Sequence, residues 1–136
     1  MPHLVILYTP NLEAQTDMGR LCRSLADTML AQRDDGGAQV FPIGGTRVLA
    51  YPAAHYAVAD DSDDHAFVYL NLRMAVGRAD AVKSRIGDAL TACAKAHFEP
   101  LLARRHVGIT LQIDEAPGQV YDGKIGNLHA LFAAAK

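Results

Sequence analysis

Two stretches of this chain carry the same succession of patterns, and this repetition limits the folds open to it. In each stretch a strongly apolar run typical of a buried strand precedes a segment with helical spacing, and another extended segment follows. The first unit covers roughly residues 1–58 and the second roughly residues 59–136. Each unit is expected to make a right-handed strand–helix–strand crossover. We therefore predict a single α+β domain over residues 1–136, with a four-stranded mixed sheet and two helices packed on one face.

The first unit begins with an apolar strand over His3–Tyr8, which ends at the sequence Thr-Pro-Asn. Apolar residues then recur at helical spacing from Leu12 to about Arg33, and Asn11 is a plausible N-cap for this helix. An extended segment follows over Val40–Tyr51, with a kinked entry at Pro42.

The second unit repeats this order. Ala66–Met74 is predicted as a central strand, and a helical stripe follows with Asp80 as its N-cap. Pro100 is expected to kink or break that helix because proline lacks the backbone donor. Val107–Asp114 alternates apolar and polar residues, as a half-buried strand does. The tail from Asn127 to Ala135 carries the three large apolar side chains Leu128, Leu131 and Phe132 and is predicted to be a docking segment.

One face of this sheet has no helix to cover it, so we expect oligomerisation to bury part of it. Arg73, inside the third strand, is expected to point to a subunit contact. The chain's net charge of −2 does not indicate a nucleic acid partner. Cys22 and Cys93 are predicted to be small core residues in a reducing compartment. No leader, membrane span or zinc spacing is visible, so we expect a cytoplasmic protein with no membrane partner and no metal.

The start of the chain is its main chemical signal. A small residue after Met1 favours removal of the methionine, and Pro2 would then present a secondary amine at the mouth of a buried strand. Proline is common at the second position, so this feature alone does not indicate catalysis. Burial and neighbouring cations would lower the pKa of such an amine and make it an effective base near neutral pH. If Met1 stays, the Pro2 nitrogen is an amide and has no basicity.

Two arginines stand at junctions between strands and loops. Arg47 follows the sequence Gly-Gly-Thr, and Arg78 follows the third predicted strand. An arginine at such a place can bind a carboxylate through two hydrogen bonds. For either arginine alone, a surface pair with an aspartate is the simpler interpretation. His3, Tyr8, Tyr69 and Tyr121 are polar groups able to line a pocket, and the chain shows no Ser-His-Asp or Cys-His arrangement.

Several short segments, in order along nearly the whole chain, carry a resemblance to a known family. They are the Met1-Pro2-His3 start, the sequence FPIGGTR ending at Arg47, AFV followed by Arg78, the His97-Phe98 pair, and NLHALF from Asn127. With these features the chain resembles the tautomerase superfamily and, within it, the 5-carboxymethyl-2-hydroxymuconate isomerase family.

This resemblance implies a homotrimer with active sites at subunit interfaces, no organic cofactor and no metal. It implies an isomerase that converts a small anionic dienol acid, 5-carboxymethyl-2-hydroxymuconate, to the conjugated 2-oxo acid in the degradation of aromatic compounds such as homoprotocatechuate. It also implies that Pro2 is the catalytic base and that Arg47 and Arg78 contact substrate carboxylates.

The chain departs from the family pattern at several positions. Where family members carry a second arginine two residues after the first, this chain has Leu49, and Tyr51 stands near a family tryptophan. These departures bear on the substrate more than on the reaction type. Two alternatives stay open, the first of them if Met1 is retained. One is a non-enzymatic trimeric binding protein on the same scaffold. The other is a hydratase, decarboxylase or dehalogenase of small unsaturated acids, for which Tyr8 or Tyr121 would be the polar partner.

Overall fold

A four-stranded mixed sheet with the order β2-β1-β3-β4 is the centre of the molecule. The computed structural model describes residues 2–133. The strands are β1 (His3–Tyr8), β2 (Arg47–Pro52), β3 (Ala66–Ala75) and β4 (Val107–Ala116). The pairs β1–β2 and β3–β4 are parallel, and the central pair β1–β3 is antiparallel. Each parallel pair belongs to one strand–helix–strand unit, so the predicted mixed sheet built from two such units is confirmed.

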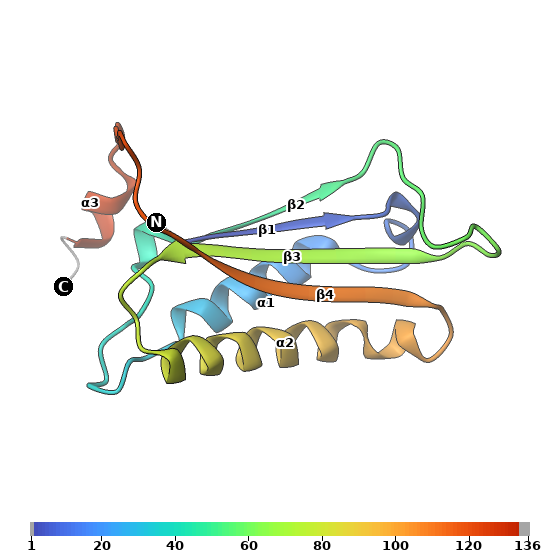
Figure 1. Ribbon diagram of the computed structural model, residues 1–136, viewed down its shortest axis with the longest axis horizontal. Coiled ribbons are helices and arrows are strands. Elements are labelled where there is room, and N and C mark those ends of the chain that lie inside the picture. Colours follow the sequence, from blue (N-terminus) through green and yellow to red (C-terminus); the bar gives the residue numbers. More distant parts are fainter. Residues whose placement is uncertain (1, 134–136) are drawn as a thin grey trace.

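Both crossover helices lie on the same face of the sheet (Figure 1). They are α1 (Met18–Leu30) and α2 (Asp80–Leu102). Short helical turns over Pro10–Leu12 and Ile43–Gly45 precede α1 and β2, and a short helix, α3 (Leu128–Ala133), lies near the end of the chain. Near the N-terminus, α3 packs against the Ile43–Gly45 turn.

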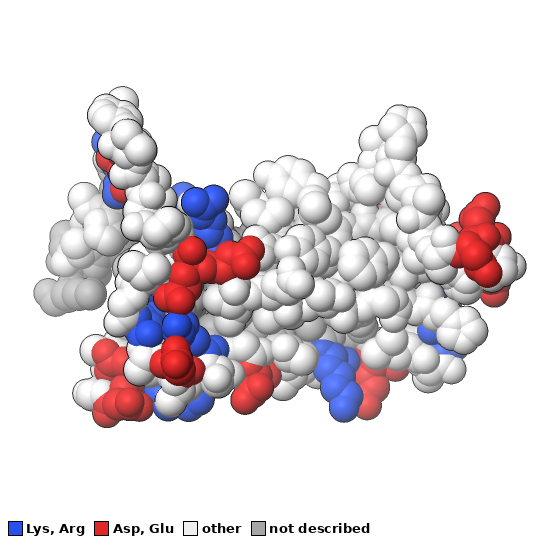
Figure 2. Space-filling view, in the orientation of Figure 1, with Lys and Arg blue, Asp and Glu red and all other residues white. Residues whose placement is uncertain are grey.

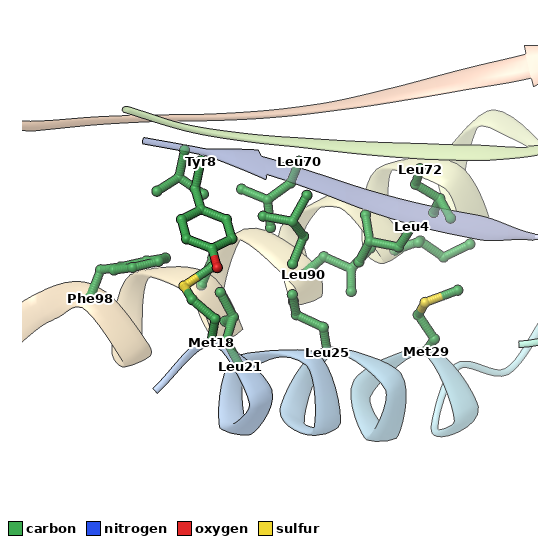
Figure 3. Close-up of a cluster of buried hydrophobic side chains, with 14 of the residues drawn as sticks. Leu4, Tyr8, Met18, Leu21, Leu25, Met29, Leu70, Leu72, Leu90 and Phe98 are labelled. Carbon is green, nitrogen blue, oxygen red and sulfur yellow. The ribbon is translucent and has the colours of Figure 1, made fainter. Parts of the chain in front are cut away.

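The hydrophobic core fills the space between this sheet face and the two helices. Figure 3 shows side chains from β1 and β3 meeting those of α1 and α2. Leu4, Ile6 and Tyr8 occupy alternate positions of β1 and are buried. Leu70 and Leu72 occupy alternate positions of β3 and are buried as well. Complete burial of one such aliphatic side chain contributes about 1.5–3 kcal/mol, so this face holds much of the folding free energy. Cys22 and Cys93 are free thiols packed against this core, as predicted.

The start of the first helix differs from the prediction. α1 begins at Met18 rather than Leu12, and its N-cap is Asp17, whose Oδ1 accepts a hydrogen bond from the Arg20 backbone at 3.0 Å. The predicted cap, Asn11, instead donates to the Asp64 carboxylate and to the His65 carbonyl oxygen, both at 2.9 Å. The apolar residue Leu12 is buried in a 3-10 turn, so it fits the helical spacing without belonging to α1.

Three further boundaries are corrected. The segment predicted as extended from Val40 contains a 3-10 turn, and β2 begins only at Arg47. Asp80 is the first residue of α2 rather than its cap, which is Ala79. Pro100 does not end α2, which continues to Leu102; the proline lies in the last turn, where few backbone bonds remain to be lost. The predicted tail forms α3 as far as Ala133, and its remaining part lies outside the described residues.

Candidate active site

A cavity of about 480 Å³ opens at the end of the sheet where β1 begins and β3 and β4 end. His3, Arg47 and Arg73 line it from the strands, and residues 118–124 close it from the segment that follows β4. Figure 2 shows basic and acidic side chains gathered at this end of the molecule, whereas the β2–β3 loop at the opposite end is acidic. Among the residues that line the cavity, the basic Arg47, Arg73 and Lys124 outnumber the acidic Asp122.

The turn before β2 fixes the position of Arg47. The Gly45 backbone donates to the Pro42 carbonyl oxygen at 3.1 Å, and the Thr46 hydroxyl donates to the same oxygen at 2.8 Å. Gly44 lies against α3, since a Cβ atom built there would come within 2.7 Å of the His129 Cα atom. Only glycine allows so close an approach, so the Gly-Gly-Thr sequence anchors both α3 and the start of the arginine-bearing strand.

The register of the sheet brings Arg73 beside Arg47. His3 lies opposite Arg47 on one side and opposite Arg73 on the other. The flanking residues Leu4 and Leu72 are fully buried beneath the sheet, so the alternation of each strand places His3 and Arg73 on the open face. The three side chains form one row across β2, β1 and β3.

This row is electropositive. Partial burial lowers the pKa of His3, and the charges of Arg47 and Arg73 lower it further. The imidazole is therefore neutral near pH 7, and the positive charge of the row comes from the two guanidinium groups. Lys124, on the opposite wall, forms an ion pair with Asp122 at 2.6 Å. That wall adds little net charge.

Pro2 directly precedes this row in the chain. It is buried and directly precedes His3 in the chain. A group at this point is shielded from water and is one residue away from His3, which the register places between Arg47 and Arg73. Such surroundings favour the neutral form of an amine.

Arg78 lies outside the cavity and is held by the main chain. Its guanidinium donates to the Ala75 carbonyl oxygen at 3.2 Å and to the Val40 carbonyl oxygen at 3.0 Å, and it stacks 5.6 Å from the centre of the Phe41 ring. It lines a neighbouring hollow of about 580 Å³ with Asp34 and Asp35. Within one chain the cavity thus contains His3 and Arg47, with Pro2 next to His3 in the chain. Arg78 donates to the carbonyl oxygen of Ala75, which lines the cavity.

Other candidate groups lie elsewhere. A larger hollow of about 770 Å³ lies near the start of α1, where Glu13 and Asp17 give it acidic walls and no arginine or lysine lines it. The Tyr8 hydroxyl there donates to Glu13 at 2.7 Å, and burial with this hydrogen bond raises the pKa of Tyr8 to about 12. Tyr121 is exposed on the segment after β4. No cluster of three metal-ligating side chains occurs among residues 2–133.

Comparison with known proteins decides the family. The model of the 5-carboxymethyl-2-hydroxymuconate isomerase family matches residues 2–132. The chain belongs to the 5-carboxymethyl-2-hydroxymuconate isomerase family. The isomerase is thus an enzyme of this family with a tautomerase-like fold, rather than a binding protein on that scaffold.

Individual relatives agree with this assignment. The isomerase is 26% identical over 132 residues to an Escherichia coli 5-carboxymethyl-2-hydroxymuconate Delta-isomerase, covering 97% of this chain and 99% of the relative. A crystal structure of a 5-carboxymethyl-2-hydroxymuconate delta-isomerase is 57% identical with a TM-score of 0.92, covering 97% of this chain and 93% of that one. A 5-carboxymethyl-2-hydroxymuconate isomerase from Deinococcus radiodurans R1 is 36% identical with a TM-score of 0.82, covering 96% and 93%. None of the described helices of the isomerase combines the length and the apolar character that a bilayer crossing requires.

The sequence predicted part of this arrangement. It identified Arg47 as a residue at a strand junction and His3 as a pocket-lining residue, and both line the cavity. It did not assign Arg73 or Lys124 to the cavity. The signal for Arg73 is present in the alternation of β3, but it becomes useful only when the antiparallel register of β1 and β3 is known.

Proposed function

We propose that this isomerase converts 5-carboxymethyl-2-hydroxymuconate, or a closely similar 2-hydroxymuconate-type dienol acid, to the conjugated 2-oxo acid. The names of its relatives support this substrate class. The observation that carries the proposal is the position of Pro2, buried and directly before a cavity row that carries two arginines. A small anion attracted by those cations would arrive next to the Pro2 nitrogen.

The proposed base is the Pro2 amine after removal of Met1. Its neutral nitrogen takes the proton from the 2-hydroxyl group, and the oxygen electrons form the 2-oxo group while the double bonds shift along the chain. The protonated amine then returns the proton to the far carbon, so that no atom is gained or lost. A free α-amino group titrates near pH 8. Burial and the neighbouring guanidinium charges lower the pKa of this amine toward the working pH, where a general base is most effective.

Arg47, in the cavity, and Arg78, outside the cavity of its own chain, are proposed to hold substrate carboxylates and to stabilise the developing enolate. Arg78 does so at a site completed by a second subunit. Arg47 makes no hydrogen bond or ion pair through its side chain with any residue from 2 to 133. Arg78 uses one donor on each terminal nitrogen for main-chain oxygens, so three of the five guanidinium N–H groups stay available. Its main-chain contacts fix its direction, and an anion bound there would meet an already ordered group.

We further propose a cytoplasmic homotrimer with sites at the subunit interfaces. Leu7, Leu49, Tyr51 and Phe67 lie on the open face of the sheet, each more than a third exposed. An apolar face of this kind is normally covered by another protein surface. Light scattering at several protein concentrations tests the trimer, and a single mass of one chain at all concentrations would contradict it.

The reaction is tested by following dienol absorbance after adding the processed protein to 5-carboxymethyl-2-hydroxymuconate and to 2-hydroxymuconate. Intact mass first verifies the loss of Met1. Pro2→Ala keeps a primary amine and is expected to retain reduced activity. Pro2→Leu hinders methionine removal and is expected to abolish activity. Arg104→Gln, on the exposed loop after α2, is the matched control and should behave like the wild type. Full activity of Pro2→Ala and Pro2→Leu would contradict the role of Pro2.

A further inference from the structure

The open face of the sheet carries one charged row that the proposed function uses only in part. Arg47, His3 and Arg73 are consecutive in the register of β2, β1 and β3, and Asp114 of β4 follows Arg73. Neighbouring strands lie about 4.8 Å apart, so the Arg47 and Arg73 backbones are separated by about 10 Å across β1. Both side chains line the same cavity.

The Arg73 guanidinium lacks a protein partner among residues 2–133. The nearest carboxylate along the row, Asp114, instead accepts a hydrogen bond from the Asn71 amide at 2.9 Å. The acid that lines the cavity, Asp122, is paired with Lys124. Most other arginines of the described chain have such partners, including Arg78, Arg85 and Arg105. Two guanidinium groups without an ion pair among residues 2–133 therefore face one small cavity, and Asp114 stands beside Arg73 in the register of β3 and β4.

Like charges about 10 Å apart, on the two strands that flank β1, repel each other weakly, and an anion bound between them relieves this repulsion. His3 does not supply that anion, and its lowered pKa keeps it from adding a third positive charge. The row thus holds two guanidinium groups, one on each side of a neutral imidazole. Each guanidinium group is called a clamp here because it can bind one carboxylate. A molecule with one carboxylate satisfies one clamp, whereas a molecule with carboxylates at both ends satisfies both.

We infer that Arg73 is a specificity-determining residue that binds a second substrate carboxylate, opposite the one held by Arg47. The inference rests on the proposed function, in which this cavity receives a small unsaturated acid. Arg73 then selects dicarboxylates over monocarboxylates of the same length. Pro2 directly precedes His3, the residue that the register places between Arg47 and Arg73.

The first experiment uses saturated acids that cannot react. Binding of adipate and of hexanoate is measured by isothermal titration calorimetry for the wild type, Arg73→Gln, Arg73→Lys and the control Arg104→Gln. Loss of a charge-assisted pair should weaken adipate binding to Arg73→Gln by about tenfold or more. Hexanoate binding should change by less than about twofold, since one clamp remains. Arg73→Lys should recover part of the adipate affinity.

The second experiment compares two reactive dienols, the dicarboxylate 2-hydroxymuconate and the monocarboxylate 2-hydroxypenta-2,4-dienoate. Arg73→Gln should raise KM for the dicarboxylate with little change in kcat, and it should leave both constants for the monocarboxylate nearly unchanged. Equal losses for both acids, or no loss of adipate affinity, would overturn the role of Arg73. Failure of the wild type to convert either dienol while adipate binding still depends on Arg73 would instead overturn the proposed reaction.

Discussion

The two faces of the sheet are built from the same strands but have different roles, one in the hydrophobic core and the other in the cavity. On the helix-covered face, Leu4, Ile6, Leu70 and Leu72 have no exposed surface. On the open face, the residues between them make the row His3, Arg47 and Arg73 and the apolar surface beyond it. Leu72 and Arg73 are neighbours in β3, yet one belongs to the core and the other to the cavity. The comparison teaches that the rigidity of one face positions the charges of the other.

The largest effect is expected from a core substitution on the covered face. Leu70→Ala removes a fully buried side chain between the sheet and the helices and should lower the free energy of unfolding by about 2–5 kcal/mol. Leu7→Ala makes the same chemical change on the open face, where nearly half of the side chain is exposed, and should cost the single chain about 1 kcal/mol or less. Urea unfolding of both variants at low protein concentration measures the difference. Equal losses of unfolding free energy in the two variants would contradict the distinction between the faces.

The next effect separates the two strand-end arginines. Arg47→Gln should lower kcat/KM by about 100-fold because a preorganised cation is lost, and it should change the free energy of unfolding by less than about 0.5 kcal/mol. Arg78→Gln should lower kcat/KM and should also cost about 1–2 kcal/mol of stability, because two hydrogen bonds to main-chain oxygens disappear. Steady-state kinetics and urea unfolding on the same samples test this. An unstable Arg47→Gln protein with normal kinetics would contradict it.

A smaller effect is expected where the turn before β2 meets α3. Gly44→Ala places a methyl group too close to the His129 backbone and should cost about 1–3 kcal/mol locally by forcing α3 away. Hydrogen exchange of the α3 amides should then become faster. Gly87→Ala is the control, because its added methyl group would meet only the Ile113 side chain at an ordinary 3.5 Å. Unchanged exchange in α3 would show that the turn does not hold this helix.

The smallest effect is a pH dependence on the covered side. Burial lowers the pKa of His97, the charge of Arg20 adds to this, and the ring lies 2.7 Å from the Thr16 hydroxyl. The unfolded chain therefore binds a proton before the folded chain does, and stability should fall as the pH drops below about 6.5. In His97→Gln this fall should be smaller. Urea midpoints at pH 7.5 and pH 5.5 measure it, and an identical pH dependence in both proteins would exclude His97 as its source.

Much of the fold could be predicted because its strands have simple patterns. His3–Tyr8 and Ala66–Ala75 are central strands with strong apolar character, and β4 alternates clearly. The start of α1 could not be predicted from periodicity, since buried Leu12 keeps the helical spacing while belonging to a 3-10 turn. Its true cap, Asp17, competes in the sequence with Asn11, whose side chain is used in a contact with distant residues.

The candidate site could be predicted only in part. The Gly-Gly-Thr sequence before Arg47 is a local signal, and so is a proline before an apolar strand. The position of Arg73 in the cavity depends on pairing between strands separated by about sixty residues. No local pattern reveals which residues meet across β1 and β3. The main-chain contacts of Arg78 likewise depend on the return of the chain past Val40.

The most direct test of the account is the titration of the Pro2 nitrogen in processed protein labelled with ¹⁵N-proline, followed by NMR. The account predicts a pKa below that of a free secondary amine, because the group is buried and directly precedes the row that carries Arg47 and Arg73. It also predicts that Arg47→Gln raises this pKa toward the free value. A pKa at or above that of the free amine, unchanged in Arg47→Gln, would contradict the claim that this end of the sheet holds a neutral base.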